Sequence, residues 1–219
     1  VSYWPVPSAT ISGTTSICAG QSATLTISLT GAAPYTFIYA VGASQVTVTN
    51  HPANIYTFTV TPAAAVTCTM VSMEDSHGCD GTISGTATVT INAQPVLSFA
   101  ATNLQCNGDN SGAINLTVSG SASNSFAWLG PDGFTAGTED ITGVKAGLYN
   151  VTVTSGDGCV ASGQATVFQP DVLTLSSTGN MVLLCNGDPT GAGSFTAAGG
   201  TAPYTFTPLV NTAGATLTS

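Results

Sequence analysis

The side chains that could perform acid–base chemistry are few in this sequence and far apart. His51 and His77 are the only histidines, and they fall in different turn segments. A catalytic set needs a nucleophile and a carboxylate placed around the base, and serine is too abundant here for its proximity to indicate one. Each histidine is therefore predicted to be an exposed turn residue.

Carboxylates could supply hydrolytic or metal-binding chemistry. The Glu-Asp doublets at 74–75 and 139–140 could act as a glycosidase pair. Adjacent residues of a strand point to opposite faces, so both doublets are predicted to lie in solvated turns at strand ends. We predict no catalytic residue and no enzymatic activity.

Three aspartates occur in Asn- and Gly-rich turns whose oxygens could bind Ca²⁺, namely Asp109, Asp157 and Asp188. None belongs to a D-x-D-x-D-G loop, so the aspartate side chains are predicted to form the turns themselves. We predict no metal site and no cofactor, with weak Ca²⁺ binding at these turns as the open alternative.

Six cysteines offer a second kind of chemistry. The nearest pair, Cys68 and Cys79, are eleven residues apart, which is not a zinc-knuckle spacing. Cysteines without metal-type spacing are typical of disulfides formed in an oxidising compartment. We therefore predict an extracellular protein.

The composition excludes several partners. One basic residue, Lys145, stands against 10 acidic ones, for a formal net charge of −9. Neutralising phosphates takes clustered Lys and Arg, so nucleic acids and anionic lipid surfaces are excluded. No stretch approaches the roughly 20 apolar residues that span a bilayer, so no membrane insertion is predicted. The hydrophobic content of 43% is enough to bury a core.

Alternating apolar and hydroxyl residues run through nearly the whole chain. Leu25, Ile27 and Leu29 fall on one face of a strand, with Thr and Ser on the other face. The same period of two recurs at 35–39, 46–49, 56–60, 87–91, 114–118 and 149–153. Short strands separated by Gly, Asn, Asp and Pro turns predict an all-β fold of antiparallel β-sandwiches.

Internal repeats indicate how these strands are grouped. Cys106-Asn-Gly-Asp109 returns as Cys185-Asn-Gly-Asp188. Gly31-Ala-Ala-Pro-Tyr-Thr-Phe37 likewise returns as Gly200-Thr-Ala-Pro-Tyr-Thr-Phe206. Gln-Pro pairs separate the repeats, so we predict a lead-in over 1–8, a first domain over 9–93, a second over 95–170, and an incomplete third unit over 171–219.

Position in the repeats suggests a disulfide pairing. Cys106 lies near the start of the second domain and Cys159 lies in the turn after the 149–153 strand, so a bond between them would close that sandwich. Cys18 occupies the equivalent early position in the first domain. The turn at Cys79 resembles the turn at Cys159, so Cys18 is predicted to pair with Cys79.

Two cysteines remain unpaired in this assignment. Cys68 shares a strand face with Val66 and Met70 and is predicted to be a buried free thiol. The partner of Cys185 would fall beyond residue 219, which leaves Cys185 unpaired in this chain.

Several of these segments resemble a known family. The segment 106–112, the segment 144–154 and the closing Gly158-Cys159 look like the SprB-type repeat of very large cell-surface adhesins of gliding bacteria, which the type IX secretion system exports. Residues 11–25 and 34–37 resemble the Ig-like (PKD-like) domains that sit beside such repeats. The resemblance implies tandem Ig-like β-sandwiches and brings no catalytic residue with it.

Repeats and resemblance together predict a non-catalytic stalk or adhesin segment of a large repetitive cell-surface protein or filament, associated with adhesion or gliding motility. Its predicted partners are neighbouring Ig-like domains of the same or an adjacent chain, together with surface polysaccharide. A carbohydrate-binding or spacer module of a secreted enzyme stays open, and it predicts an exposed aromatic platform. Trp128 is instead predicted to be a core aromatic of its sandwich.

Overall fold

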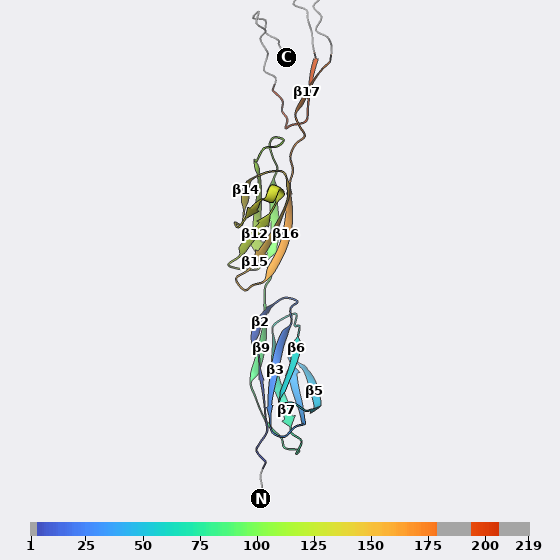
Figure 1. The fold of residues 1–219 in the computed structure, drawn as a ribbon, viewed down its shortest axis with the longest axis vertical. Helices are drawn as coiled ribbons and strands as arrows, with labels where there is room; N and C mark the ends of the chain where they lie inside the picture. Colours follow the sequence, from blue (N-terminus) through green and yellow to red (C-terminus); the bar gives the residue numbers. More distant parts are fainter. Residues whose placement is uncertain (1–3, 179–193, 206–219) are drawn as a thin grey trace, which may run out of the picture. The chain divides into compact units, whose positions relative to one another are not determined.

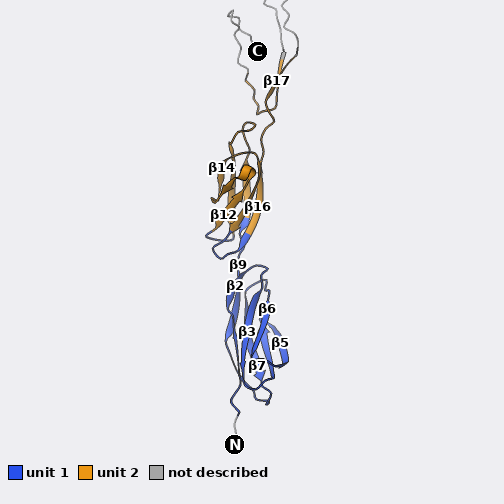
Figure 2. Ribbon diagram, in the orientation of Figure 1, with its two compact units in different colours: residues 1–96, 120–123, 154–160 blue, residues 97–119, 124–153, 161–219 orange. Residues whose placement is uncertain are grey.

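The alternating segments of the sequence form strands joined by short turns (Figure 1). The computed structural model describes residues 4–178 and 194–205. It divides into two compact units (Figure 2). Unit 1 comprises residues 1–96, 120–123 and 154–160, and unit 2 comprises residues 97–119, 124–153 and 161–219. The predicted all-β fold of Ig-like sandwiches is confirmed.

Two sheets form the sandwich of unit 1. The first has the order β6-β3-β1-β8, with β6 (Ile55–Val60), β3 (Ala23–Thr30), β1 (Ser8–Ser12) and β8 (Thr82–Ser84). The second has the order β2-β9-β7-β4-β5, with β2 (Thr15–Cys18), β9 (Thr86–Asn92), β7 (Val66–Glu74), β4 (Tyr35–Val41) and β5 (Ser44–His51).

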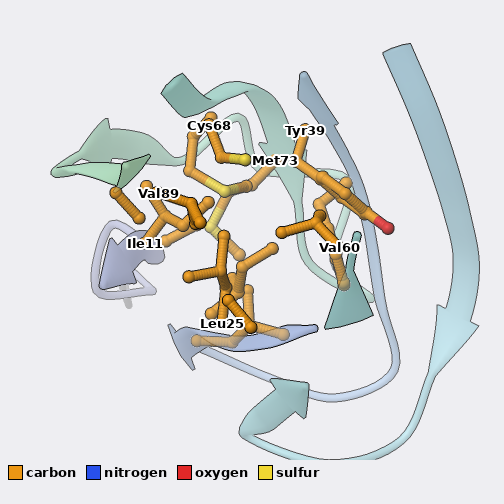
Figure 3. Close-up of a cluster of buried hydrophobic side chains, with 14 of the residues drawn as sticks. Ile11, Leu25, Tyr39, Val60, Cys68, Met73 and Val89 are labelled. Carbon is orange, nitrogen blue, oxygen red and sulfur yellow. The ribbon is translucent and has the colours of Figure 1, made fainter. Parts of the chain in front are cut away.

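The inward-facing residues of both sheets build the core of unit 1 (Figure 3). In β3, Leu25 and Ile27 are fully buried, whereas Thr24 is exposed and Thr26 is half-buried, as the period of two predicts. Phe37 of β4 and Val89 of β9 are also fully buried in this cluster. The core therefore comes from alternate positions of strands that the sequence pattern identified.

Two strand pairs of unit 1 are parallel, in addition to the predicted antiparallel pairs. β1 pairs with β8 and β2 pairs with β9 in parallel register, with Cys18 opposite Asn92. β1 and β2 follow one another in the chain but join different sheets. Each of them therefore lies along a late strand that runs in the same direction.

Unit 2 contains a second sandwich. One sheet has the order β10-β11-β14, with β10 (Val96–Thr102), β11 (Gly112–Ser119) and β14 (Ile141–Val144). The other has the order β13-β12-β15-β16, with β13 (Thr135–Ala136), β12 (Ser125–Leu129), β15 (Gly147–Thr154) and β16 (Val160–Val167). A 3₁₀ turn, η1 (Pro131–Gly133), precedes β13, and β17 (Thr174–Thr178) pairs antiparallel with β18 (Ser194–Ala198).

Aromatic side chains anchor the second sandwich. Trp128 is 1% exposed, and its indole Nε1–H donates a hydrogen bond to the backbone oxygen of Thr138 at 3.0 Å. The Tyr149 hydroxyl donates to the backbone oxygen of Lys145 at 2.9 Å, which ties the start of β15 to the turn before it. The prediction that Trp128 is a core aromatic is confirmed.

The bounds of the two compact units differ from the predicted domain bounds. Residues 154–160, the turn between β15 and β16, belong to unit 1 although the second predicted domain spans 95–170. Residues 120–123 also belong to unit 1, and the Gly156 N–H donates a hydrogen bond to the Ala122 oxygen among them. The division at 93–95 and 170–171 stays a prediction, and so does the incomplete third unit, most of which lies outside the described residues.

Candidate functional site

Of the two histidines predicted to be exposed turn residues, His77 is one, whereas His51 is the half-buried last residue of β5. His51 Nε2 lies 3.0 Å from the Ile55 oxygen, and the His77 ring stacks on Trp4 with 4.0 Å between ring centroids. Asp140 accepts a hydrogen bond from the Leu116 N–H at 2.9 Å. The two acidic doublets lie in different units, 74–75 in unit 1 and 139–140 in unit 2.

Asp75 is the most buried carboxylate of the described residues, at 5% exposed. Its oxygens accept hydrogen bonds from the N–H groups of Ala32 at 3.2 Å, His77 at 3.0 Å and Cys79 at 3.3 Å. Burial by itself raises the pKa of Asp75, but these N–H groups outweigh it and hold the pKa below the ordinary value. The carboxylate therefore stays charged and stabilises the turn at 75–79 through these hydrogen bonds.

We expect Asp75→Asn to destabilise unit 1 at neutral pH and to flatten its acid denaturation. A carboxyl with a lowered pKa stabilises the folded state above its ordinary pKa of 3.8, and this contribution is lost as the pH falls through the lower folded value. Calorimetric melting between pH 2 and 7 measures both effects. Glu74→Gln, a neighbouring exposed carboxyl, is the control. Equal pH slopes for wild type and Asp75→Asn would contradict the assignment.

Asp109 also forms a turn. Its carboxylate accepts hydrogen bonds from the Ser111 N–H at 3.0 Å, the Ser111 hydroxyl at 2.8 Å and the Cys106 N–H at 2.9 Å. The Ser111 N–H is the main cause that lowers the pKa of Asp109. Among the described residues no group of three or more His, Cys, Asp or Glu side chains could hold a metal ion. Asp188 lies outside the described residues, and weak Ca²⁺ binding stays an untested expectation.

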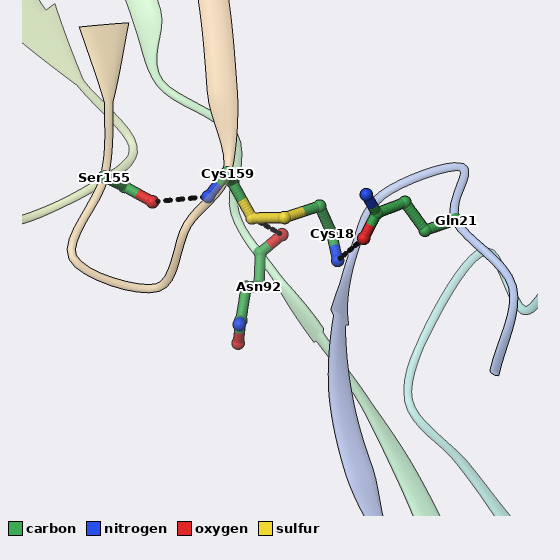
Figure 4. Close-up of a disulfide and its surroundings, with 5 residues drawn as sticks. All are labelled: Cys18, Gln21, Asn92, Ser155 and Cys159. Carbon is green, nitrogen blue, oxygen red and sulfur yellow. Dashed lines mark hydrogen bonds between the residues drawn. A yellow bond between two sulfur atoms is a disulfide. The ribbon is translucent and has the colours of Figure 1, made fainter.

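One disulfide is formed in the described part of the chain, between Cys18 and Cys159 (Figure 4). The bonded cysteines are separated by 141 residues, and their Cα atoms are 5.5 Å apart. Both belong to unit 1, Cys18 at the end of β2 and Cys159 in the turn between β15 and β16. The predicted pairs Cys18–Cys79 and Cys106–Cys159 are therefore wrong, because Cys79 and Cys106 are free thiols.

Strand direction explains why Cys18 and Cys79 do not pair. β2 runs parallel to β9 and brings Cys18 beside Asn92, the last residue of β9. β7 runs antiparallel to β9, with Thr69 opposite Thr86 at the start of β9. After β7 ends at Glu74, the chain continues beyond this end of the sheet, the end at which β9 starts, to Cys79. Cys18 and Cys79 consequently lie at opposite ends of one sheet.

The same reasoning separates Cys106 from Cys159. Cys159 directly precedes β16, whereas the Leu104 N–H donates to the Phe168 oxygen just beyond the end of β16. Cys106 follows Leu104 by two residues. Eight strand residues span roughly 25 Å, far more than the Cα separation that a disulfide tolerates.

The bonded cysteines are held in two different turns. The Cys18 N–H donates to the Gln21 side-chain oxygen at 3.2 Å, and the Gln21 N–H donates back to the Cys18 oxygen at 3.0 Å. The Cys159 N–H donates to the Ser155 hydroxyl at 3.1 Å. The Cys159 Sγ lies 3.9 Å from the Asn92 oxygen, and both cysteines are buried. The disulfide is therefore fixed on both sides by ordered turns.

Cys68 is free and fully buried in β7, as predicted. Burial raises the pKa of its thiol, which lowers its reactivity. Cys185, predicted to be unpaired, lies outside the described residues.

Thiol labelling of the native chain is expected to separate the cysteines into three groups. A maleimide should modify Cys106, which is exposed, and Cys79, which is partly exposed, while Cys68 reacts only after unfolding. Cys18 and Cys159 should react only after reduction. Peptide mapping of the labelled protein checks each position. Modification of Cys18 or Cys159 without reductant would contradict the observed pairing.

A surface depression of about 270 Å³ in unit 2 is lined by Phe134, Tyr149 and the ion pair between Lys145 Nζ and Asp132 at 2.8 Å. The ion pair lowers the pKa of Asp132 and raises the pKa of Lys145, so both groups stay charged. An acid–base catalyst needs a pKa moved toward neutrality. The pKa shifts of Asp132 and Lys145 therefore do not suit either residue to act as an acid–base catalyst in this depression.

The arrangement defines a class of protein, namely tandem Ig-like β-sandwiches that contain a Cys18–Cys159 disulfide. Residues 98–133, which contain the motif at Cys106, match the family model described as SprB repeat. The resemblance to that repeat predicted from the sequence is confirmed. The match implies a cell-surface protein. No helix within the described residues is long and apolar enough to cross a membrane.

Two solved structures are similar to this chain. A C-terminal 282-residue fragment of intimin, in complex with the intimin-binding domain of the translocated intimin receptor, is 14% identical with a TM-score of 0.45, over 80% of this chain and 67% of that chain. Fibronectin(III)-like modules of CbhA from Clostridium thermocellum are 16% identical with a TM-score of 0.34, over 74% and 93%. No curated protein sequence matches the chain.

Proposed function

We propose that this chain is a non-catalytic segment of an extracellular stalk or adhesin, attached to the cell surface and associated with adhesion or gliding motility. Export by a type IX secretion system belongs to the same proposal. The stalk places an adhesive surface away from the cell. Neighbouring Ig-like domains of the same or an adjacent chain are its structural partners.

The Cys18–Cys159 disulfide is the observation that carries the proposal. It joins a residue near the start of the described chain to one 141 positions later. A pull on the two ends then passes from residue 18 to residue 159 through the bond, and residues 19–158 carry no tension. This path for the load suits a stalk that is pulled by the motion of a cell.

The titratable groups support a non-catalytic role. The pKa values of Asp75, Asp109 and Asp132 are lowered, and those of Lys145 and Cys68 are raised. Every one of these shifts moves away from neutrality and stabilises the ordinary protonation state. Catalytic groups show the opposite tendency. The described residues thus hold their charges for structural purposes.

The proposal is tested on cells that produce the protein. An antibody raised against residues 9–170 should label intact cells, and an in-frame deletion of the same residues should reduce attachment to a surface and spreading on it. A Cys68→Ser strain serves as the control for the manipulation. Labelling that requires permeabilised cells would contradict a surface location, and unchanged attachment would contradict an adhesive role.

Trp4 is the observation that favours a second candidate, polysaccharide binding. Trp4 is 63% exposed, and its ring stacks on His77, which makes the kind of flat aromatic surface that sugars pack against. Trp4→Ala should then abolish retention on a polysaccharide column, while Leu129→Ala, an exposed apolar residue elsewhere, should not. Equal retention of wild type and Trp4→Ala would remove this candidate.

A further inference from the structure

The turn that holds Cys159 occurs twice in this chain. In residues 155–159 the Ser155 N–H donates to the Cys159 oxygen at 2.9 Å, and the Gly158 N–H donates to the Ser155 oxygen at 2.9 Å. In residues 75–79 the Asp75 N–H donates to the Cys79 oxygen at 3.3 Å, and the Gly78 N–H donates to the Asp75 oxygen at 3.0 Å. We call these the late turns.

The agreement between the late turns extends to side chains and surroundings. Each cysteine N–H donates to the side chain of the first turn residue, Ser155 at 3.1 Å and Asp75 at 3.3 Å. The second residue of each turn donates its N–H to an alanine oxygen of another loop, from Gly156 to Ala122 and from Ser76 to Ala32. Gly158 and Gly78 share a positive φ, of 80° and 72°. Cys79 therefore occupies the same structural position as Cys159.

The turn that holds Cys18 also occurs twice, and we call the pair the early turns. The Cys18 N–H donates to the Gln21 side chain at 3.2 Å, and the Gln21 N–H donates back to the Cys18 oxygen. The Cys106 N–H donates to the Asp109 carboxylate at 2.9 Å, and the Asp109 N–H donates back to the Cys106 oxygen. The glycine between them has φ of 81° in the first turn and 77° in the second. Cys106 is thus the structural counterpart of Cys18.

The observed disulfide joins one early turn, at Cys18, to one late turn, at Cys159. The remaining early-turn thiol, Cys106, is exposed, and the remaining late-turn thiol, Cys79, is partly exposed. Each unpaired thiol thus sits in a turn whose twin in the same chain forms a disulfide. The sequence carries a third copy of the early motif at Cys185, outside the described residues.

We propose that Cys106 and Cys79 are disulfide half-sites for further sandwiches of this type. Cys106 bonds to the late-turn cysteine of one additional sandwich, and Cys79 bonds to the early-turn cysteine of another. The additional sandwiches belong either to the same polypeptide or to a second copy, in which Cys106 of one chain bonds to Cys79 of the next. The inference rests on the proposed stalk function and makes the stalk a covalently cross-linked array.

Formation of each bond is a two-electron oxidation. The two thiols lose two protons and two electrons to a disulfide oxidant, such as oxidised glutathione, which is reduced to two thiols. The bond forms by attack of one thiolate on a mixed disulfide of its partner. Exposure of Cys106 allows this attack, whereas the buried Cys68 is excluded from it.

Disulfide mapping of the native protein tests the proposal. Cells are lysed with a thiol-blocking reagent and no reductant, and the protein is digested with pepsin, since a single Lys or Arg leaves trypsin almost no sites. We expect the Cys106 peptide bonded to a late-turn peptide and the Cys79 peptide bonded to an early-turn peptide. Recovery of either cysteine as a blocked thiol, or a Cys106–Cys106 bond, would overturn the proposal.

The source of the partner follows from a second measurement. The purified 219-residue chain is equilibrated with oxidised and reduced glutathione and compared with Cys106→Ser, Cys79→Ser and the control Cys68→Ser. If second copies are the source, the wild type and Cys68→Ser form reducible oligomers, whereas Cys106→Ser and Cys79→Ser, which each lack one of the two bonding partners, stay monomeric. If the same polypeptide is the source, the chain stays monomeric while the native protein still shows both bonds.

These outcomes are independent of the test of the proposed function. Retention of the Cys18–Cys159 bond in each serine variant, checked by the same mapping, shows that the variant has folded. Free thiols at Cys79 and Cys106 on a protein that still labels intact cells would reject the cross-linked array and leave the stalk. Failure of surface labelling would reject the stalk, whatever the thiols do.

Discussion

Reduction of the Cys18–Cys159 disulfide is expected to lengthen a chain pulled by its two ends by about 500 Å. The bond closes a loop over residues 19–158, so unfolding of the oxidised chain releases only the residues outside this loop. After reduction the whole loop extends at roughly 3.6 Å per residue. This is the largest mechanical consequence of the pairing that the structure contains.

Optical-tweezers measurements of total contour length, with and without reductant, check the prediction. The double variant Cys18→Ser/Cys159→Ser should show the long extension without reductant, and Cys68→Ser should behave as wild type. Replacement of both partners avoids a lone thiol that could form new bonds. An oxidised wild-type chain as long as the double variant would contradict the pairing.

Trp128→Ala is expected to lower the free energy of unfolding of unit 2 by about 3–5 kcal/mol. Its ring is 1% exposed, packs edge-to-face with Phe99 at 6.3 Å between centroids, and donates a hydrogen bond to Thr138. The substitution leaves a large cavity and an unpaired carbonyl. Calorimetry should show the melting temperature of unit 2 falling by more than about 10 °C.

Leu129→Ala is the matched control for this substitution. Leu129 follows Trp128 in β12 but points to the opposite face and is 62% exposed, so its truncation should change stability by less than about 0.5 kcal/mol. The melting of unit 1 supplies an internal reference in both variants. Equal losses for Trp128→Ala and Leu129→Ala would mean that Trp128 does not anchor the core.

The two predicted effects, on the contour length and on the stability of unit 2, arise from different kinds of structural feature. The role of Trp128 follows from a local pattern, a large aromatic at an inward position of an alternating strand. The role of Cys18 follows from its distance to a residue 141 positions away, which no local pattern encodes. The sequence reasoning accordingly predicted the first and missed the second.

Much of the fold and part of the site were determined by the sequence alone. Alternation of apolar and hydroxyl residues places Leu25 and Ile27 inward because successive strand residues point to opposite faces. The same rule identified Cys68 as a buried thiol. The repeated motif at Cys106 identified the SprB repeat, which residues 98–133 match.

The pairing of the cysteines was decided by the tertiary structure. The sequence shows that the turns at Cys79 and Cys159 are alike, but it does not show at which end of a sheet each turn lies. That depends on the direction of β2, which runs parallel to β9 and carries Cys18 to the end opposite Cys79. A disulfide forms only between residues that the fold brings within a few ångströms, and strand direction is a property of the assembled sheet.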